Sequence, residues 1–409
     1  MRNVYLIDEH VSSRTNGIGP FIKAYTACLK KMGVNLSIVS FNEDVAEFDI
    51  KMEKGVRKLL FPIFPTGNFL NHPQIVTRFF KQYIKDSADN VFCFNHSPCR
   101  DLLQTIKDSF PLSKIVFTIH DMAWTGALKG ESAMLAHIVA HRKRKAYREK
   151  YGNLLDYFDQ EKQMYDFVDA IVCLSHNTYD VLRDVYRIDE NKINLIPSGM
   201  RGTKIVTTED EKMQIRKKWN IGKDEKILFY AGRLSGPKGI YPLVAAFTEV
   251  LKSYPDTRLV LAGSANSEWS YFLASIKRIS SKIITTGFIS KKELKEWYRI
   301  VDIGIIPSYY EQCPYVAIEM MMYGLPIVVS DANGLRDMFT DKENAVVVPL
   351  GDRQNSKEFT RHIRDALMLL LESEQLRREL GKKAKQTYRN TYSLTAMCER
   401  YQRFFNNIN

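Results

Sequence analysis

Short apolar, β-rich runs alternate with amphipathic stretches along most of the chain, and this alternation restricts the fold more than any other feature. The runs of the first half are NVYLID, NLSIVSF, NVFCFN, KIVFTIHD and DAIVCLS. Those of the second half are KILFYAG, TRLVLAG, KIITTGFI, DIGIIPS and LPIVVSD. Strands separated by helix-length stretches form parallel sheets covered by helices. The sequence therefore predicts an α/β protein with two Rossmann-like, doubly wound domains.

A stretch rich in glycine, proline and charge, residues 197–210, separates the two series. Such a change in composition is typical of a domain boundary. We expect an amino-terminal domain over residues 1–200 and a carboxyl-terminal domain over residues 205–390, facing one another across a cleft. Residues 391–409 are predicted to form a separate amphipathic helix that packs on the first domain.

Composition and charge narrow the function without defining it. Neither a secretory signal nor an apolar run of about 18 residues is visible. The six cysteines lack CxxC or metal-ligand spacing, so we expect reduced thiols, no metal and a cytoplasmic protein. The formal net charge of +12 indicates an anionic partner. A nucleic-acid partner is not expected, because no RRM, KH, helix-turn-helix or zinc signature accompanies the charge.

The segment YAGRLSGPKGIYPLVAAF places Arg233 and Lys238 between a predicted strand and a helix that begins near Ile240. The carboxyl end of a strand beside a helix amino terminus favours anions. Glycines let a phosphate approach the backbone, arginine offers a fork of donors, and lysine adds a point charge. Two solvated cations beside a tight turn explain this segment equally well.

The segment PSYYEQCPYVAIEMMMYG adds two carboxylates at the end of another predicted strand. Pro314 is suited to a first helical turn, which leaves Glu311 in the preceding loop and Glu319 inside the helix. A carboxylate in an apolar helix is costly unless a donor meets it, and a nucleotide ribose supplies hydroxyl donors. Cys313 invites a reading as a nucleophile, but no partner base is identifiable, and we favour a structural role.

In their order and spacing, GRLxxxKG, E-x7-E and the loop DANGLRD resemble the retaining GT-B glycosyltransferases of family four, the glycosyl transferases group 1. The resemblance covers nearly all of the carboxyl half, and more loosely the amino half through TNGIGPF, TIHD, CLSHNT and LIPSGM. It implies transfer of a hexose from a UDP- or GDP-sugar to an acceptor hydroxyl, in polysaccharide or glycolipid assembly. It also implies that the final helix is the family's crossover helix.

The resemblance also implies residue roles. Arg233 and Lys238 would bind the diphosphate and neutralise the leaving group without metal or cofactor. Glu319 would bind the ribose, and Glu311 would contact the donor sugar. The main chain at the GFIS strand end would read the base. The implied nucleotide-site residues are Gly17, Gly19, Arg233, Lys238, Phe288, Ile289, Glu311, Pro314, Tyr315 and Glu319. The family's GGxPE-like loop lacks its Pro and Glu here, which leaves the donor open.

Glycines and histidines mark the amino domain. Gly17 and Gly19 lead from the first strand into a helix, where backbone N–H groups can approach a phosphate or an acceptor. His10, His96 and His120 each follow a predicted strand. His120 matches the family's acceptor-side histidine and is our catalytic candidate with Arg233, Lys238 and Glu311. A strand-end histidine hydrogen-bonded in a turn is the alternative, and it is favoured for His10 and His96.

The segment AHRKRKAYREKYGN is strongly basic, with six Arg or Lys among the ten residues from His141 to Lys150. A solvated helix explains it, as does peripheral docking on an anionic membrane that carries a lipid-linked acceptor. Three other functions stay open: a sugar-nucleotide epimerase, a phosphorylase, and a non-catalytic partner that binds sugar nucleotide.

Overall fold

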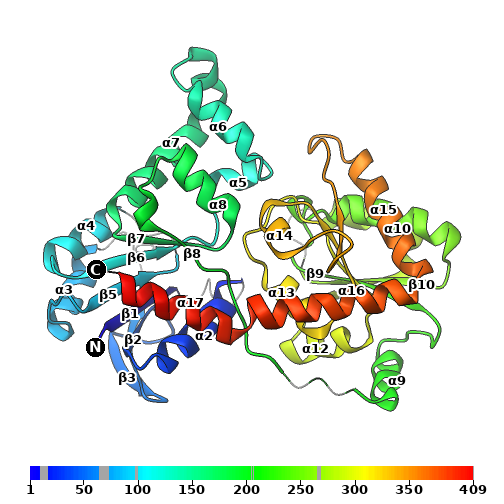
Figure 1. The fold of residues 1–409 in the computed structure, drawn as a ribbon, viewed down its shortest axis with the longest axis horizontal. Coiled ribbons are helices and arrows are strands. Elements are labelled where there is room, and N and C mark those ends of the chain that lie inside the picture. The colour runs from blue at the N-terminus through cyan, green and yellow to red at the C-terminus, as the bar shows by residue number, and fades with distance from the viewer. Residues whose placement is uncertain are drawn as a thin grey trace. The chain divides into compact units, whose positions relative to one another are not determined.

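The computed structural model describes residues 1–9, 17–63, 73–96, 100–203, 205, 207–264 and 269–408. The chain divides into two compact units (Figure 1). Unit 1 consists of residues 1–201 together with 394–409, and unit 2 of residues 202–393.

Unit 1 is built on an eight-stranded sheet with the order β3-β4-β2-β1-β5-β6-β7-β8. Its pairings are parallel except that of β3 with β4. The order reverses direction between β1 and β5, so the sheet is doubly wound. The strands are β1 (Asn3–Glu9), β2 (Asn35–Glu43), β3 (Asp49–Glu53), β4 (Val56–Pro62), β5 (Asn90–Phe94), β6 (Lys114–Thr118), β7 (Ala170–Cys173) and β8 (Ile193–Leu195).

The helices of unit 1 cover this sheet, and α6 and α7 extend away from it as an arm (Figure 1). They are α2 (Ile18–Lys31), α3 (Pro73–Tyr83), α4 (Arg100–Ser109), α5 (Ala123–Ala127), α6 (Ser132–Ala140), α7 (Lys145–Phe167), α8 (His176–Asp180) and α17 (Leu394–Asn407). The core is rich in aromatic rings, and Phe92 of β5 packs against Tyr5, Phe80 and Phe110.

The final helix, α17, packs on α2. The rings of Tyr25 and Tyr401 lie 4.3 Å apart, and a disulfide joins Cys28 to Cys398. The expectation that all six cysteines are reduced is therefore wrong for this pair. The two residues are 370 positions apart, so no local spacing marks them, and only the return of the chain to unit 1 brings them together.

Unit 2 is built on a six-stranded parallel sheet with the order β11-β10-β9-β12-β13-β14. Numbered within the unit, this is the Rossmann order 3-2-1-4-5-6, which reverses between β9 and β12. The strands are β9 (Lys226–Ala231), β10 (Thr257–Ala262), β11 (Ile283–Gly287), β12 (Ile303–Ile306), β13 (Ile327–Ser330) and β14 (Val346–Val348). The prediction of two doubly wound, parallel-sheet units is confirmed.

Proline and glycine mark the two ends of one helix of unit 2. Pro314 is the N-cap of α13, one position before the first helical turn in which it was expected, and Gly324, with a φ of 70°, is its C-cap, as glycine predicts. The helices are α9 (Glu209–Lys218), α10 (Ile240–Ser253), α11 (Trp269–Ile276), α12 (Lys291–Ile300), α13 (Tyr315–Tyr323), α14 (Asn333–Met338), α15 (Lys357–Glu372) and α16 (Glu374–Thr387). Among the described residues of both units, no helix is long and apolar enough to cross a bilayer.

Candidate functional site

The predicted cations and the first predicted carboxylate lie at the strand ends where the strand order of unit 2 reverses. Arg233 and Lys238 follow β9, and Glu311 follows the neighbouring strand β12. The Nζ atom of Lys238 lies 2.6 Å from Oε1 of Glu311, and the two side chains are only 18% and 13% exposed. Ligands of doubly wound sheets bind outside the carboxyl ends of the strands at such a reversal. The fold therefore places this ion pair where a ligand is expected.

Two further side chains hold Glu311 and Lys238. The hydroxyl of Ser308 donates to Oε1 of Glu311 at 2.8 Å, and Ser308 itself is buried. The ring centroid of Tyr310 lies 5.8 Å from Nζ of Lys238, at the distance of a cation–π contact. The Glu311 oxygen thus accepts from a hydroxyl and an ammonium together, which fixes its position at the strand end.

The turn that carries Lys238 depends on glycine. Gly239 has a φ of 70°, and a Cβ atom there would lie 1.8 Å from the backbone oxygen of Pro307. No other residue type fits so close to the β12 strand end in this conformation. The DANGLRD loop also requires a residue without a Cβ atom, because a Cβ on Gly334 would lie 2.0 Å from the backbone oxygen of Gln312. The loop keeps this close approach although it lacks the family's Pro and Glu.

Arg233 has an exposed side chain on a fixed backbone. The hydroxyl of Tyr230 donates to the backbone oxygen of Arg233 at 2.6 Å. Burial raises the pKa of Tyr230, and the nearby Glu311 adds to the shift, so the hydroxyl stays protonated and keeps donating. The guanidinium is therefore presented to solvent from a backbone that is held in place at the end of β9.

Glu319 lies in α13, and the hydroxyl of Tyr298 in α12 donates to its Oε2 atom at 2.8 Å. Burial raises the pKa of Glu319, whereas the hydrogen bond from Tyr298 and the charges of Lys291 and Lys295 oppose that shift. The donor that a carboxylate needs inside this apolar helix is supplied, at one oxygen, by the protein itself. The ribose role of Glu319 stays a prediction.

The other predicted residues of unit 2 lie at strand and helix ends. Phe288 follows β11 and is 79% exposed, with Ile289 half-buried beside it. Pro314 and Tyr315 are half-buried at the start of α13. Cys313 is buried, as the structural interpretation of this thiol requires. The structure brings Lys238 together with Glu311, and the other residues lie at strand and helix ends of the same unit.

In unit 1, polar side chains gather at the carboxyl ends of β1, β5 and β6. Asp8 Oδ1 lies 3.6 Å from Nε2 of His96, across the reversal between β1 and β5. The ring of Phe21 packs edge-on against His120, with centroids 4.6 Å apart. His10 lies outside the described residues. Among those described, the Nε2 atom of His120 is buried and has no hydrogen-bond partner.

The environment keeps the His120 imidazole neutral. Burial, together with a smaller contribution from the nearby His96, lowers the pKa of His120 to about 3. A neutral imidazole carries one unprotonated nitrogen, which can accept a hydrogen bond from a hydroxyl. Gly17 is the exposed N-cap of α2, and Gly19 lies in that helix's first turn. The catalytic and binding roles of these residues stay predictions.

Comparison with known proteins gives the family. The sequence profile of the glycosyl transferases group 1 matches residues 211–387, and that of glycosyltransferase family 4 matches residues 15–201. The chain belongs to the group 1 glycosyltransferases. The sucrose-phosphate synthase of Thermosynechococcus elongatus shares the GT-B fold, with a TM-score of 0.76, 17% identity and coverage of 100% of this chain and 99% of the other.

Other similar proteins are distant in sequence. An uncharacterised glycosyltransferase of Methanocaldococcus jannaschii is 29% identical over 181 residues, which are 44% of this chain and 46% of that protein. The chain thus spans about half the length of this curated relative. The structure of HepE from Anabaena, solved in complex with UDP and glucose, has a TM-score of 0.71 at 14% identity and covers 99% of this chain and 100% of the other.

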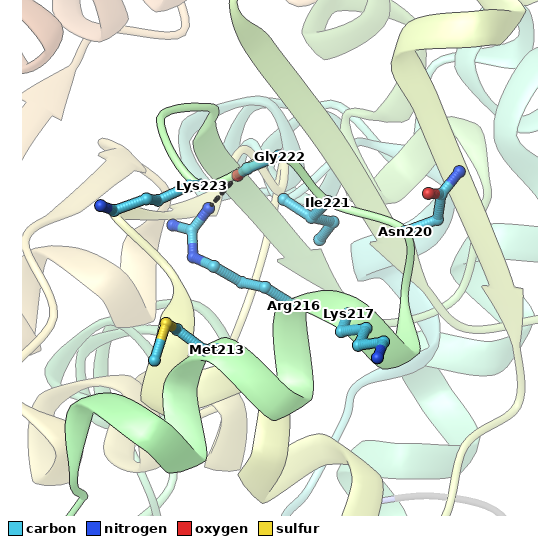
Figure 2. Close-up of a pocket in the computed structure, with 7 residues that line it drawn as sticks. All are labelled: Met213, Arg216, Lys217, Asn220, Ile221, Gly222 and Lys223. Carbon is cyan, nitrogen blue, oxygen red and sulfur yellow. Dashed lines mark hydrogen bonds between the residues drawn. The ribbon is translucent and has the colours of Figure 1, made fainter.

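A hollow of about 370 Å³ in unit 2 of this glycosyltransferase lies away from the candidate site (Figure 2). It is lined by α9 and the loop before β9, at the amino edge of the sheet, opposite the strand ends that carry Lys238. Its Arg216 already donates to the backbone oxygens of Gly222 and Glu225. The hollow is therefore not assigned to sugar-nucleotide binding.

Sequence reasoning missed several side chains of the site, among them Ser308, Tyr298 and Asp8. Ser308 could have been predicted, because it ends the apolar run DIGIIPS and so lies at the end of a strand. Tyr298 and Asp8 could not, because each contacts a residue from a different strand or helix. Only the parallel order of the sheets brings these pairs together.

Proposed function

We propose that the protein transfers a sugar from a nucleoside diphosphate sugar to an acceptor hydroxyl, with retention of the anomeric configuration. The observation that carries the proposal is the Lys238–Glu311 ion pair at the strand reversal of unit 2, with Arg233 in the loop at the same end of β9. Two cations and a helix amino terminus in this place suit a diphosphate. Family membership supports sugar transfer as the reaction.

The charge of the leaving group determines how these residues would act. When the bond between the sugar and the diphosphate breaks, negative charge grows on the departing oxygen. Arg233 and Lys238 would stabilise that charge in place of a metal ion. A bound diphosphate would share Lys238 with Glu311, leaving the Glu311 carboxylate beside the sugar.

Retention in a single step requires the acceptor oxygen to attack from the face that the diphosphate leaves. We propose that the departing phosphate oxygen takes the proton of the acceptor hydroxyl as the new bond forms. A covalent route needs two carboxylates around the scissile bond, and only Glu311 is a candidate here. Neutral His120, with its unpartnered Nε2, would orient the acceptor hydroxyl.

A panel of nucleotides tests this proposal. We expect UDP and a UDP-sugar to raise the melting temperature, since HepE, which shares the fold, was solved with UDP and glucose. A ligand at 100 times its Kd stabilises by about 2.7 kcal/mol, which thermal denaturation detects easily. GDP-sugars are tested in parallel. No stabilisation by any nucleoside diphosphate sugar would contradict the proposal.

The reaction class distinguishes this proposal from the other functions of the same fold. An epimerase would return an isomerised sugar nucleotide, and a phosphorylase would need inorganic phosphate. A non-catalytic partner would bind sugar nucleotide without turnover. Only a transferase releases free nucleoside diphosphate in step with a glycosylated acceptor.

We further propose that the acceptor is lipid-linked or membrane-proximal, and that the arm of unit 1 docks on an anionic surface. The structure puts the run Arg142–Lys145 largely in the turn between α6 and α7. The bulky apolar residues Leu135 and Ile138 of α6 are fully buried, so charge, rather than an inserted apolar face, supports docking. Arg142 and Arg148 pair with Asp159 and Asp156.

Flotation with vesicles tests whether the arm docks on an anionic membrane. The exposed Lys143 and Arg144 would each contribute about 1 kcal/mol of attraction to an anionic surface. Changing both to Gln is expected to weaken binding to phosphatidylserine vesicles by roughly 10- to 30-fold. Added salt should also weaken the binding of the wild-type protein. The variant Lys217→Gln/Lys223→Gln, in unit 2, is the matched control. Absence of wild-type binding at low salt would refute docking.

A further inference from the structure

We propose that Tyr298 is a positioning residue of the nucleotide site, whose hydroxyl holds the Glu319 carboxylate for the ribose. The inference rests on the proposed function and adds a residue to it. The contact that carries it is the hydrogen bond from the Tyr298 hydroxyl to Oε2 of Glu319, 2.8 Å long. With Oε2 engaged, Oε1 is the oxygen left to accept from ribose hydroxyls.

The ring of Tyr298 is fixed between the sheet and α13. It is 3% exposed and packs edge-on against Phe229 of β9, with centroids 5.6 Å apart. On the other side it contacts Tyr323 of α13, at 5.1 Å. A ring enclosed on both sides holds its hydroxyl in one place, and a fixed donor limits the rotamers of Glu319.

Helix α12 connects this contact to the predicted base-binding strand end. The helix begins directly after Phe288 and Ile289, where Ser290 and Glu293 form a capping box. Tyr298 lies two turns further along the same helix. One short, capped helix therefore connects two parts of the expected nucleotide site. The segment expected to read the base precedes the helix, and Tyr298, which holds the expected ribose carboxylate, lies within it.

The charges around Glu319 make its protonation sensitive to this hydroxyl. The groups that act on its pKa are Tyr298, Lys291 and Lys295, all from α12, and the Glu319 charge in turn contributes to the raised pKa of Tyr323 on its own helix. Burial raises the pKa of Glu319, and the Tyr298 hydrogen bond opposes that shift. Ribose binding needs the carboxylate, so affinity is lost as the pH falls through this pKa. Without the hydroxyl, the pKa rises further and the loss begins at a higher pH.

Tyr298→Phe removes the hydroxyl and keeps the ring. We expect it to weaken nucleoside diphosphate binding and raise the donor KM by about 10-fold, as for a hydrogen bond to a charged group, with little change in kcat. The acid limb of binding should move to higher pH. Tyr323→Phe is the matched control, since its hydroxyl is not a hydrogen-bond partner of Glu319 among the described residues, and wild-type affinity is expected.

A ribose-free probe separates positioning from a structural effect. A 2′,3′-dideoxynucleoside diphosphate offers no ribose hydroxyls, so wild type and Tyr298→Phe should bind it equally. An equal loss for both nucleotides would show general damage and overturn the inference, as would unchanged affinity for the ribonucleotide. If the wild type binds no nucleoside diphosphate, the proposed function fails first, and this inference fails with it.

Discussion

Lys238→Ala and Arg233→Ala are each expected to lower kcat by about 10²- to 10³-fold, which corresponds to roughly 2.7 to 4 kcal/mol of lost charge stabilisation. Each variant removes a cation from the strand end at which the diphosphate would lie. Lys238→Ala should have the larger effect, since it also leaves the Glu311 carboxylate, 13% exposed, without its cation. Steady-state kinetics with the preferred donor, together with nucleotide titrations, measure both losses.

The matched control is Lys217→Ala, which removes the same charge from α9 at the opposite edge of the sheet. We expect wild-type kinetics from it. If Arg233 and Lys238 replace a metal ion, a chelator should leave the wild-type rate unchanged. Normal kinetics in both site variants would remove the diphosphate assignment, and a strict Mg²⁺ requirement would remove the metal-free mechanism.

Gly239→Ala is expected to destabilise unit 2 by roughly 2 to 5 kcal/mol. A left-handed backbone costs a non-glycine residue about 1–2 kcal/mol, and relieving an overpacked contact costs about 1–3 kcal/mol more. Here the contact is with the backbone oxygen of Pro307, 1.8 Å from the added Cβ atom. Urea denaturation measures the loss as a lower transition midpoint.

Gly287→Ala separates the two contributions. Gly287 has a similar φ of 66°, but an added Cβ atom there meets nothing within 4 Å. Only the backbone cost of about 1–2 kcal/mol is expected. Equal losses in the two variants would mean that the strand end at Pro307 yields to the methyl group, and that the turn carrying Lys238 is less constrained than the geometry indicates.

Much of the fold could be predicted from the sequence, because it is encoded in local patterns. The strands of unit 2 are short apolar runs buried on both faces, as in IGII of β12 and IVVS of β13, and parallel sheets require this. Pro314 and Gly324 marked the ends of α13 for equally local reasons. The positions of Arg233, Lys238 and Glu311 at strand ends followed from the same patterns.

What the sequence did not predict depends on contacts between distant segments. The Cys28–Cys398 disulfide joins α2 to α17. The contact of Tyr298 with Glu319 joins two helices that flank β12. Neither pairing has a spacing that a single sequence reveals. The same limit applies to α6, because the sequence does not show that its Leu135 and Ile138 are buried in the core of unit 1.

The most direct test of the account is to incubate the protein with the nucleoside diphosphate sugar that stabilises it best, together with candidate acceptors. Released nucleoside diphosphate is quantified, and the acceptor is analysed by mass spectrometry and NMR. The account predicts one equivalent of nucleoside diphosphate for each acceptor that gains a hexose, with the anomeric configuration of the donor retained. Nucleotide turnover that yields only an isomerised sugar nucleotide, or cleavage that depends on phosphate, would contradict it.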